Sequence, residues 1–343
     1  MRRTLLLSSL LVIEAVCGIA QYANSSFAWD EINFLLAFGD SYTFVQGTHG
    51  RQNFSFIGDA FDFSFTPNEL LENEIVQNQL GTSAGGPNWV EYLTNCFSGL
   101  PSKCKKQLWD FAFAGANVDT IYTPLHHNYT VPFVDQIRQW ETYAEPILPV
   151  DHSKALVAVF IGINDINDLT KVMFPLGNTT DFPSLYKEVV SSEFRALERV
   201  YEAGYRNYLF MNLPPLNRNP ANTAKGPLAA LPNATMIHQY NAQISTSASE
   251  FQTKHPDSKT MVFDTYEYLS GILDHPAEFG ITNTTNFCPR YDAPDIATDY
   301  AKYGCQPLRE YFWYNSGHVT SRIHELMAGA VDEFLREESR ACY

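Results

Sequence analysis

Residues 33–42 read NFLLAFGDSY, a short apolar run that ends in glycine, aspartate and serine. Four more runs of this kind follow along the chain, at residues 108–113, 155–161, 207–212 and 260–264. Each has the length of a strand, and its lack of alternation suits a parallel strand that is buried on both faces. The sequence therefore predicts a five-stranded, mostly parallel central sheet.

Longer stretches with helical spacing separate these runs, and they cover residues 131–144, 182–203, 236–254 and 319–337. Alternating strands and helices are typical of an open α/β sheet covered on both faces, so we expect a three-layer α/β/α sandwich. No repeat, Gly/Ser linker or charge block divides the chain, and the proline-rich residues 214–232 are expected to form a surface loop. We therefore predict a single domain over residues 21–343.

The first twenty residues are predicted to be a signal peptide. Arg2 and Arg3 precede an apolar stretch at residues 5–13, and Gly18 and Ala20 place small residues before the cleavage point. No later segment reaches the ~18 continuous apolar residues of a transmembrane helix. We expect a secreted, extracellular protein without a membrane partner.

Two features fit an oxidising and glycosylating route. Acceptor motifs for N-glycosylation begin at six positions: Asn24, Asn53, Asn128, Asn178, Asn233 and Asn283. We expect Cys96 to pair with Cys104 and Cys288 with Cys305, because each pair closes a local loop. Cys342 is then a free thiol, bonded to another chain, or a sign that the pairing differs.

The composition excludes several classes of protein. With 45% hydrophobic and 14% aromatic residues, the chain is neither disordered nor fibrous. The net charge of −15 argues against nucleic-acid binding, because an acidic surface repels phosphate groups. No cysteine motif or calcium-loop pattern is present, and the adjacent His126 and His127 are expected to face solvent, so we predict no metal and no cofactor. We expect a monomer.

Chemically useful residues come directly after the first three apolar runs and before the last helix. These four blocks are Gly39-Asp40-Ser41, Ala114-Gly115-Ala116-Asn117, Gly162-Ile163-Asn164-Asp165 and Asn315-Ser316-Gly317-His318. Each block alone would be a turn or a helix cap. Since ligands of open α/β sheets bind at the carboxyl ends of the strands, we expect the blocks to meet there.

With these blocks the sequence resembles the SGNH hydrolase superfamily, also called GDSL esterases and lipases. The blocks stand in the family's order, with residues 111–116 as the second and Tyr42 where the family name has leucine. The size, the secretory route and the Trp-Tyr-Asn-x-x-His ending at residues 313–318 are most similar to fungal acetylesterases of carbohydrate esterase family 16. The resemblance implies a flavodoxin-like SGNH fold and an esterase that releases acetyl groups from xylo-oligosaccharides and similar acetylated carbohydrates.

Ester hydrolysis assigns a role to individual residues of the blocks. A serine hydroxyl needs an adjacent base, so Ser41 is the expected nucleophile and His318 the expected general base. The backbone N–H groups of Ser41 and Gly115 and the side-chain amide of Asn164 are expected to form the oxyanion hole. Trp313 is expected to border the site and contact the substrate, because it stands close to His318 in sequence and aromatic faces stack on sugar rings.

Asn315 stands where many members of the family carry an aspartate. An amide cannot supply the charge that stabilises the imidazolium. Three explanations stay open. A Ser41–His318 dyad could be oriented by a neutral acceptor such as Asn315 or a carbonyl; a carboxylate from residues 292–299 could complete a triad; or activity could have been lost. The first is preferred because the other catalytic groups are intact.

The substrate is the least constrained part of the prediction. Residues 214–232 and 274–307 are candidate walls of the pocket. Two other functions stay open besides the acetylesterase: a lipolytic esterase or lysophospholipase that takes longer acyl chains, and an inactive carbohydrate-binding relative.

Overall fold

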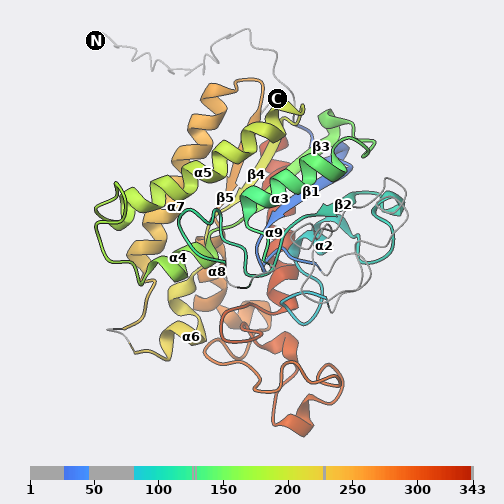
Figure 1. Ribbon diagram of the computed structural model, residues 1–343. Coiled ribbons are helices and arrows are strands. Elements are labelled where there is room, and N and C mark those ends of the chain that lie inside the picture. Colours follow the sequence, from blue (N-terminus) through green and yellow to red (C-terminus); the bar gives the residue numbers. More distant parts are fainter. Residues whose placement is uncertain (1–26, 46–80, 126, 128–129, 227–228, 341–343) are drawn as a thin grey trace, which may run out of the picture.

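The computed structural model describes residues 27–45, 81–125, 127, 130–226 and 229–340. At its centre is a five-stranded, all-parallel sheet in the order β2-β1-β3-β4-β5 (Figure 1). The strands are β1 (Phe34–Gly39), β2 (Gln107–Asp110), β3 (Ala155–Phe160), β4 (Asn207–Met211) and β5 (Lys259–Phe263). Each predicted apolar run forms one of these strands, so the prediction of the sheet is confirmed.

Helices cover both faces of this sheet (Figure 1). α3, α5 and α7 pack together on one face, and α2, α8 and α9 on the other. The helices are α2 (Trp89–Thr94), α3 (Phe133–Gln139), α4 (Ile163–Leu169), α5 (Phe182–Glu202), α6 (Pro220–Thr223), α7 (Ala234–Lys254), α8 (Thr265–Asp274) and α9 (Ser321–Arg340). The α/β/α sandwich is therefore confirmed.

Two elements have other bounds than the sequence predicts. The second strand ends at Asp110, whose carboxylate accepts the backbone N–H of Ala112 at 2.9 Å in a turn, although the N–H groups of Phe111 and Phe113 still donate to β1. The last helix starts at Ser321, because Val319 forms an isolated β-bridge with Trp313. In both places a specific tertiary or turn contact overrides the local pattern.

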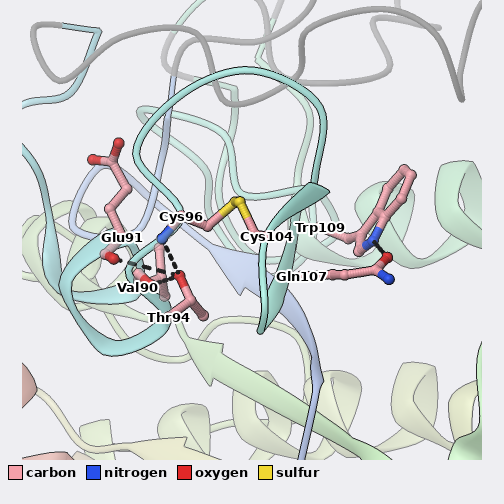
Figure 2. The surroundings of a disulfide bond; sticks show 7 residues. All are labelled: Val90, Glu91, Thr94, Cys96, Cys104, Gln107 and Trp109. Atoms are coloured by element: carbon pink, nitrogen blue, oxygen red, sulfur yellow. Dashed lines mark hydrogen bonds between the residues drawn. A yellow bond between two sulfur atoms is a disulfide. The ribbon is translucent and has the colours of Figure 1, made fainter. Parts of the chain in front are cut away.

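Both predicted disulfides are present. Cys96–Cys104 ties the end of α2 to the segment that leads into β2 (Figure 2). Cys288–Cys305 closes a loop in a small lobe, residues 280–311, which has an apolar cluster of its own. This lobe is orange-red at the bottom of Figure 1 and lies away from the sheet.

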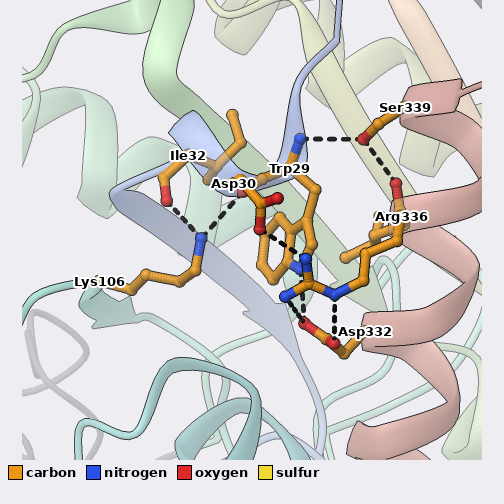
Figure 3. Close-up of polar contacts among 8 residues, drawn as sticks. Trp29, Asp30, Ile32, Lys106, Asp332, Arg336 and Ser339 are labelled. Carbon is orange, nitrogen blue, oxygen red and sulfur yellow. Dashed lines mark hydrogen bonds and ion pairs between the residues drawn. The ribbon is translucent and has the colours of Figure 1, made fainter.

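Polar contacts fasten the segment before β1 to α9 (Figure 3). The indole N–H of Trp29 donates to Asp332 at 2.6 Å, and the backbone N–H of Trp29 donates to Ser339 at 2.9 Å. Arg336 pairs with Asp332 at 2.8 Å. The Lys106 ammonium lies 3.9 Å from the centre of the Trp29 ring, close enough for a cation–π contact. The start and the end of the described chain are thus held together at the amino edge of the sheet.

Some predicted features can be compared only in part. Asn178 and Asn233 are exposed and Asn283 is partly exposed, which is compatible with glycosylation. Outside the described residues lie the predicted signal peptide and Asn24, Asn53, Asn128, His126 and Cys342. Within the described residues, none of the helices combines the length and the apolar character that a membrane crossing requires.

Three of the buried carboxyl groups have a raised pKa, and they are Glu91, Asp110 and Glu193. Burial raises the pKa of Glu91 and of Glu193 from 4.5 to about 8, and the charge of Asp165 adds to the effect at Glu193. Burial also raises the pKa of Asp110 well above its usual range. Such a group stabilises the fold below its pKa in the unfolded chain, and this contribution is lost as the pH rises through its pKa in the folded chain.

Replacing Glu193 by glutamine is expected to reduce the loss of stability between pH 4.5 and pH 8, because an amide does not ionise. On the order of 1–3 kcal/mol of the wild-type loss should disappear. Urea unfolding at several pH values measures it. Glu188→Gln, on the exposed face of α5, serves as the control. If the free energy of unfolding falls equally with pH in Glu193→Gln and in the wild type, the raised pKa of Glu193 is contradicted.

Replacing Cys288 and Cys305 by serine is expected to loosen the lobe and to leave the sheet intact. The bond spans 17 residues, and a loop of this size contributes about 3 kcal/mol. Limited proteolysis with mapping of the cut sites is the measurement. We expect new cuts within residues 280–311; cuts spread over the strands would mean that the lobe is not independent.

Candidate active site

A cavity of about 410 Å³ opens at the carboxyl ends of β1, β2 and β3. The chain leaves β1 toward β2 on one side and takes up β3 on the other, which makes this edge the switch point of the sheet. The described residues that line the cavity are Ser41, Ser83, Phe113, Ala114, Gly115, His127, Ile163, Asn164, Asn167, Asn219, Ala221, Asn222, Lys225, Gly317 and His318. The structure thus brings residues of all four blocks to one place.

Ser41 stands on a tight turn at the end of β1. Gly39 has φ +156°, and a Cβ there would lie 2.2 Å from the carbonyl oxygen of Phe160 on β3. The carboxylate of Asp40 accepts the N–H of Tyr42 at 3.0 Å. The buried amide of Gln136 accepts the N–H of Gly39 at 3.0 Å and donates to its carbonyl at 2.8 Å. These contacts hold the backbone on both sides of Ser41.

Ser41, His318 and Asn315 form a continuous chain of hydrogen bonds. Nε2 of His318 lies 2.7 Å from Oγ of Ser41, and Nδ1 lies 3.0 Å from Oδ1 of Asn315. The same oxygen of Asn315 accepts the backbone N–H groups of Gly317 and His318, each at 2.9 Å. Since an amide oxygen only accepts, Nδ1 carries the proton and Nε2 can accept the hydroxyl of Ser41.

The surroundings of His318 favour the neutral imidazole. The ring lies 5.6 Å from that of Tyr42, whose hydroxyl donates to the carbonyl of Gly317 at 3.0 Å. Burial lowers the pKa of His318 to about 4. A neutral imidazole at pH 7 is the form that can take a proton from serine.

Candidate oxyanion donors face Ser41 from the turns after β2 and β3. Gly115 adopts φ +83°, a conformation that glycine takes without strain. Asn164 donates one amide hydrogen to the carbonyl of Ala116 at 2.8 Å, and its nitrogen carries a second hydrogen that can donate into the cavity. Asp165 accepts the N–H of Val118 at 3.0 Å, so the two turns are linked. The Asn164 side chain is therefore held in place before any ester binds.

One predicted site residue is wrong. Trp313 is only 1% exposed, and its indole N–H donates to the carbonyl of Thr284 at 2.8 Å. It is absent from the described lining of the cavity. Nearness in sequence to His318 did not bring the ring to the cavity, because the β-bridge between Trp313 and Val319 directs it into the core.

Of the two predicted pocket walls, the structure places one at the cavity. Residues 214–232 contribute Asn219, Ala221, Asn222 and Lys225, on and beside α6. Residues 274–307 contribute none of the described lining residues. In the stretch considered for an alternative carboxylate, Asp295 pairs with Lys302 at 2.8 Å. Nδ1 of His318 instead contacts Oδ1 of Asn315.

Sequence reasoning missed several lining residues. Asn167 lies one helical turn after Asn164, and this spacing of three could have indicated it. His127 is exposed as predicted, but it stands at the cavity. Lys225 and Ser83 carry no recognisable pattern, because their places depend on how long loops fold back over the strand ends.

A family model described as GDSL-like Lipase/Acylhydrolase matches residues 35–331, which include all four blocks. An acetylesterase from Thermothelomyces thermophilus is 26% identical over 302 residues, covering 87% of this chain and 86% of that protein. An acetylesterase from Hypocrea jecorina is 22% identical over 330 residues, covering 87% of each. The GDSL esterase/lipase APG from Arabidopsis thaliana is 22% identical over 248 residues, covering 65% of this chain and 67% of that protein.

Replacing Asn164 by alanine is expected to lower kcat for a small ester by about 10²–10³ with a small change in KM, because one oxyanion donor is lost. Steady-state kinetics measure this split. Asn167→Ala, which changes the same cavity one helical turn away, is the matched control and should lose far less in kcat. Equal losses in both variants would contradict a special role for Asn164.

Proposed function

Since the chain belongs to the family of GDSL-like lipases and acylhydrolases and is a carboxylic ester hydrolase, we propose that it removes acetyl groups from acetylated carbohydrates. The observation that carries the proposal is the polar wall beside Ser41 and His318. Hydrogen-bonding side chains supply much of that wall, and they are His127, Asn167, Asn219, Asn222 and Lys225. Hydroxyl groups of a sugar can form further hydrogen bonds with such a wall, whereas a long acyl chain can form none.

The first half of the proposed reaction forms an acetyl-enzyme. Nε2 of His318 takes the proton of Ser41, and Oγ attacks the carbonyl carbon of the ester. The N–H groups of Ser41, Gly115 and Asn164 bind the oxyanion of the tetrahedral intermediate. His318 then protonates the leaving sugar oxygen as the carbon–oxygen bond breaks.

The second half releases acetate. His318 takes a proton from a water molecule, whose oxygen attacks the carbonyl carbon of the acetyl-enzyme. The oxyanion donors act again, and Oγ of Ser41 leaves with the proton that His318 returns. The enzyme is regenerated with no redox step. Phe113, Ala114 and Ile163 supply apolar side chains to the lining, and we propose that the methyl of the acetyl group contacts them.

A lipolytic function is the second candidate, and a separate observation favours it. Among the described residues, five large apolar side chains are exposed: Ile121, Leu125, Met173, Leu176 and Leu231. Leu125 stands two residues before the lining residue His127, and the other four lie in the stretches of chain that follow Gly115, Asn167 and Lys225. Apolar groups near an active-site mouth could contact a lipid surface.

We further propose that the protein is secreted. The sequence pattern of residues 1–20 and the six acceptor motifs support this. Two disulfides are typical of an oxidising compartment. The proposed ligand is a small ester. A non-catalytic role is disfavoured, because the 2.7 Å contact of Ser41 with His318 is the contact that catalysis requires.

The wild-type enzyme is expected to hydrolyse acetyl esters at least ten times more efficiently than octanoyl esters, and Ser41→Ala is expected to lose about 10³-fold or more. The measurement is kcat/KM over an acyl series, together with acetate release from acetylated xylo-oligosaccharides. Ser316→Ala, an exposed serine of the same block, is the matched control.

Three results would overturn parts of this proposal. A preference for octanoyl esters would favour the lipolytic candidate. Activity on simple acetates but none on acetylated oligosaccharides would remove the carbohydrate substrate. Full activity in Ser41→Ala would remove the nucleophile.

A further inference from the structure

Asn315 is held in one amide orientation by the backbone. Its Oδ1 accepts two backbone N–H groups, from Gly317 and His318, both at 2.9 Å. Rotating the amide by 180° would point the hydrogens of Nδ2 at these two N–H groups and break both bonds. Losing a hydrogen bond in a partly buried site costs about 1–3 kcal/mol per unsatisfied group. The oxygen therefore faces His318 at all times.

This orientation fixes the tautomer of His318. Nδ1 lies 3.0 Å from the fixed oxygen and must donate, which leaves Nε2 without a proton and 2.7 Å from Ser41. In a serine protease, replacing the triad aspartate by asparagine costs about 10⁴-fold, because the tautomer is wrong. Here the two backbone N–H groups prevent that error, so an amide can orient the base.

Among the residues that the structure describes, the side-chain partners of the His318 ring are Asn315 and Ser41, and neither is a carboxylate. From the turn after β1, Tyr42 faces the ring of His318, and Asp40 faces Tyr42. From α9, His324 approaches, and burial and the charge of His318 lower the pKa of His324 to about 3. The titratable side chains on the described lining of the cavity, besides His318, are His127 and Lys225. Burial alone accounts for the lowered pKa of His318.

The buried carboxyl groups independently indicate that the protein is suited to acidic medium. Glu91, Asp110 and Glu193 are 5% exposed or less, and Glu91 and Glu193 each have an oxygen in the interior without a hydrogen-bond partner. A protonated carboxyl tolerates such a place far better than a carboxylate does. The interior is thus most stable when these groups are neutral, in acidic medium.

We propose that Asn315 is a positioning residue that holds His318 in the catalytic tautomer without a counter-charge, and that the enzyme consequently keeps its activity in acidic medium. An aspartate at this position would stabilise the imidazolium, and the base would become protonated at a higher pH. The inference rests on the proposed esterase function for its kinetic test only, because the state of His318 can also be observed without turnover.

The kinetic test is the pH dependence of kcat/KM for acetate release in wild type, Asn315→Asp and Asn315→Ala. The wild-type activity should fall only below about pH 5, since an imidazole is neutral above its pKa. In Asn315→Asp the fall should begin at least one pH unit higher, as an adjacent opposite charge raises the pKa of histidine. Asn315→Ala should lose at least tenfold at every pH. An unchanged acid limb in Asn315→Asp, or full activity in Asn315→Ala, would overturn the proposal.

The second measurement needs no substrate. Nitrogen-15 NMR of histidine-labelled enzyme, titrated from pH 8 to pH 4, reports which ring nitrogen of His318 carries the proton; assignment uses His318→Gln. We expect the proton on Nδ1 throughout the neutral form, and its presence on Nε2 would overturn the proposal even in an active enzyme. An inactive wild type with the expected NMR result would instead remove the proposed function alone. In His324→Gln, kcat/KM should fall at the same acidic pH as in the wild type. A shift of this pH in His324→Gln would mean that the fall reports the titration of His324.

Discussion

The pairing of β1 with β3 is the constraint on which the site depends. Gly39 and Phe160 are partners at the ends of these strands, and the N–H of Asp40 donates to the carbonyl of Phe160 at 3.2 Å. Only a residue without a side chain can approach this carbonyl so closely. Because the register is fixed there, the turns that carry Ser41 and Asn164 lie side by side. Gly115 and His318 then complete the site from the turn after β2 and from the segment before α9.

Neutral polar groups do much of the positioning that charged groups perform in other hydrolases. Asn315 orients His318, Asn164 bridges two turns, and Gln136 holds both polar groups of Gly39. A buried amide costs less to desolvate than a buried ion, and it does not change its charge with pH. Asp165 is an exception, because here a carboxylate does the positioning: both of its oxygens accept the backbone N–H of Val118.

The sequence was sufficient for those parts of the molecule that local patterns encode. The five strands follow from short apolar runs, and Ser41, Gly115, Asn164 and His318 follow from their places directly beside such runs or before the last helix. The direction of Trp313 did not follow, because a β-bridge to Val319 sets it. The place of Lys225 depends on the path of a long loop, which contacts distant in sequence determine.

The cavity and the paired ends of the described chain lie on opposite edges of the sheet. Trp29 and Ser339 meet before the amino end of β1, whereas Ser41 follows its carboxyl end. A tether joined to either end would therefore leave the molecule on the side away from the substrate. Fusion to a polysaccharide-binding module, or attachment to a solid support, could orient the catalytic mouth outward without a long spacer.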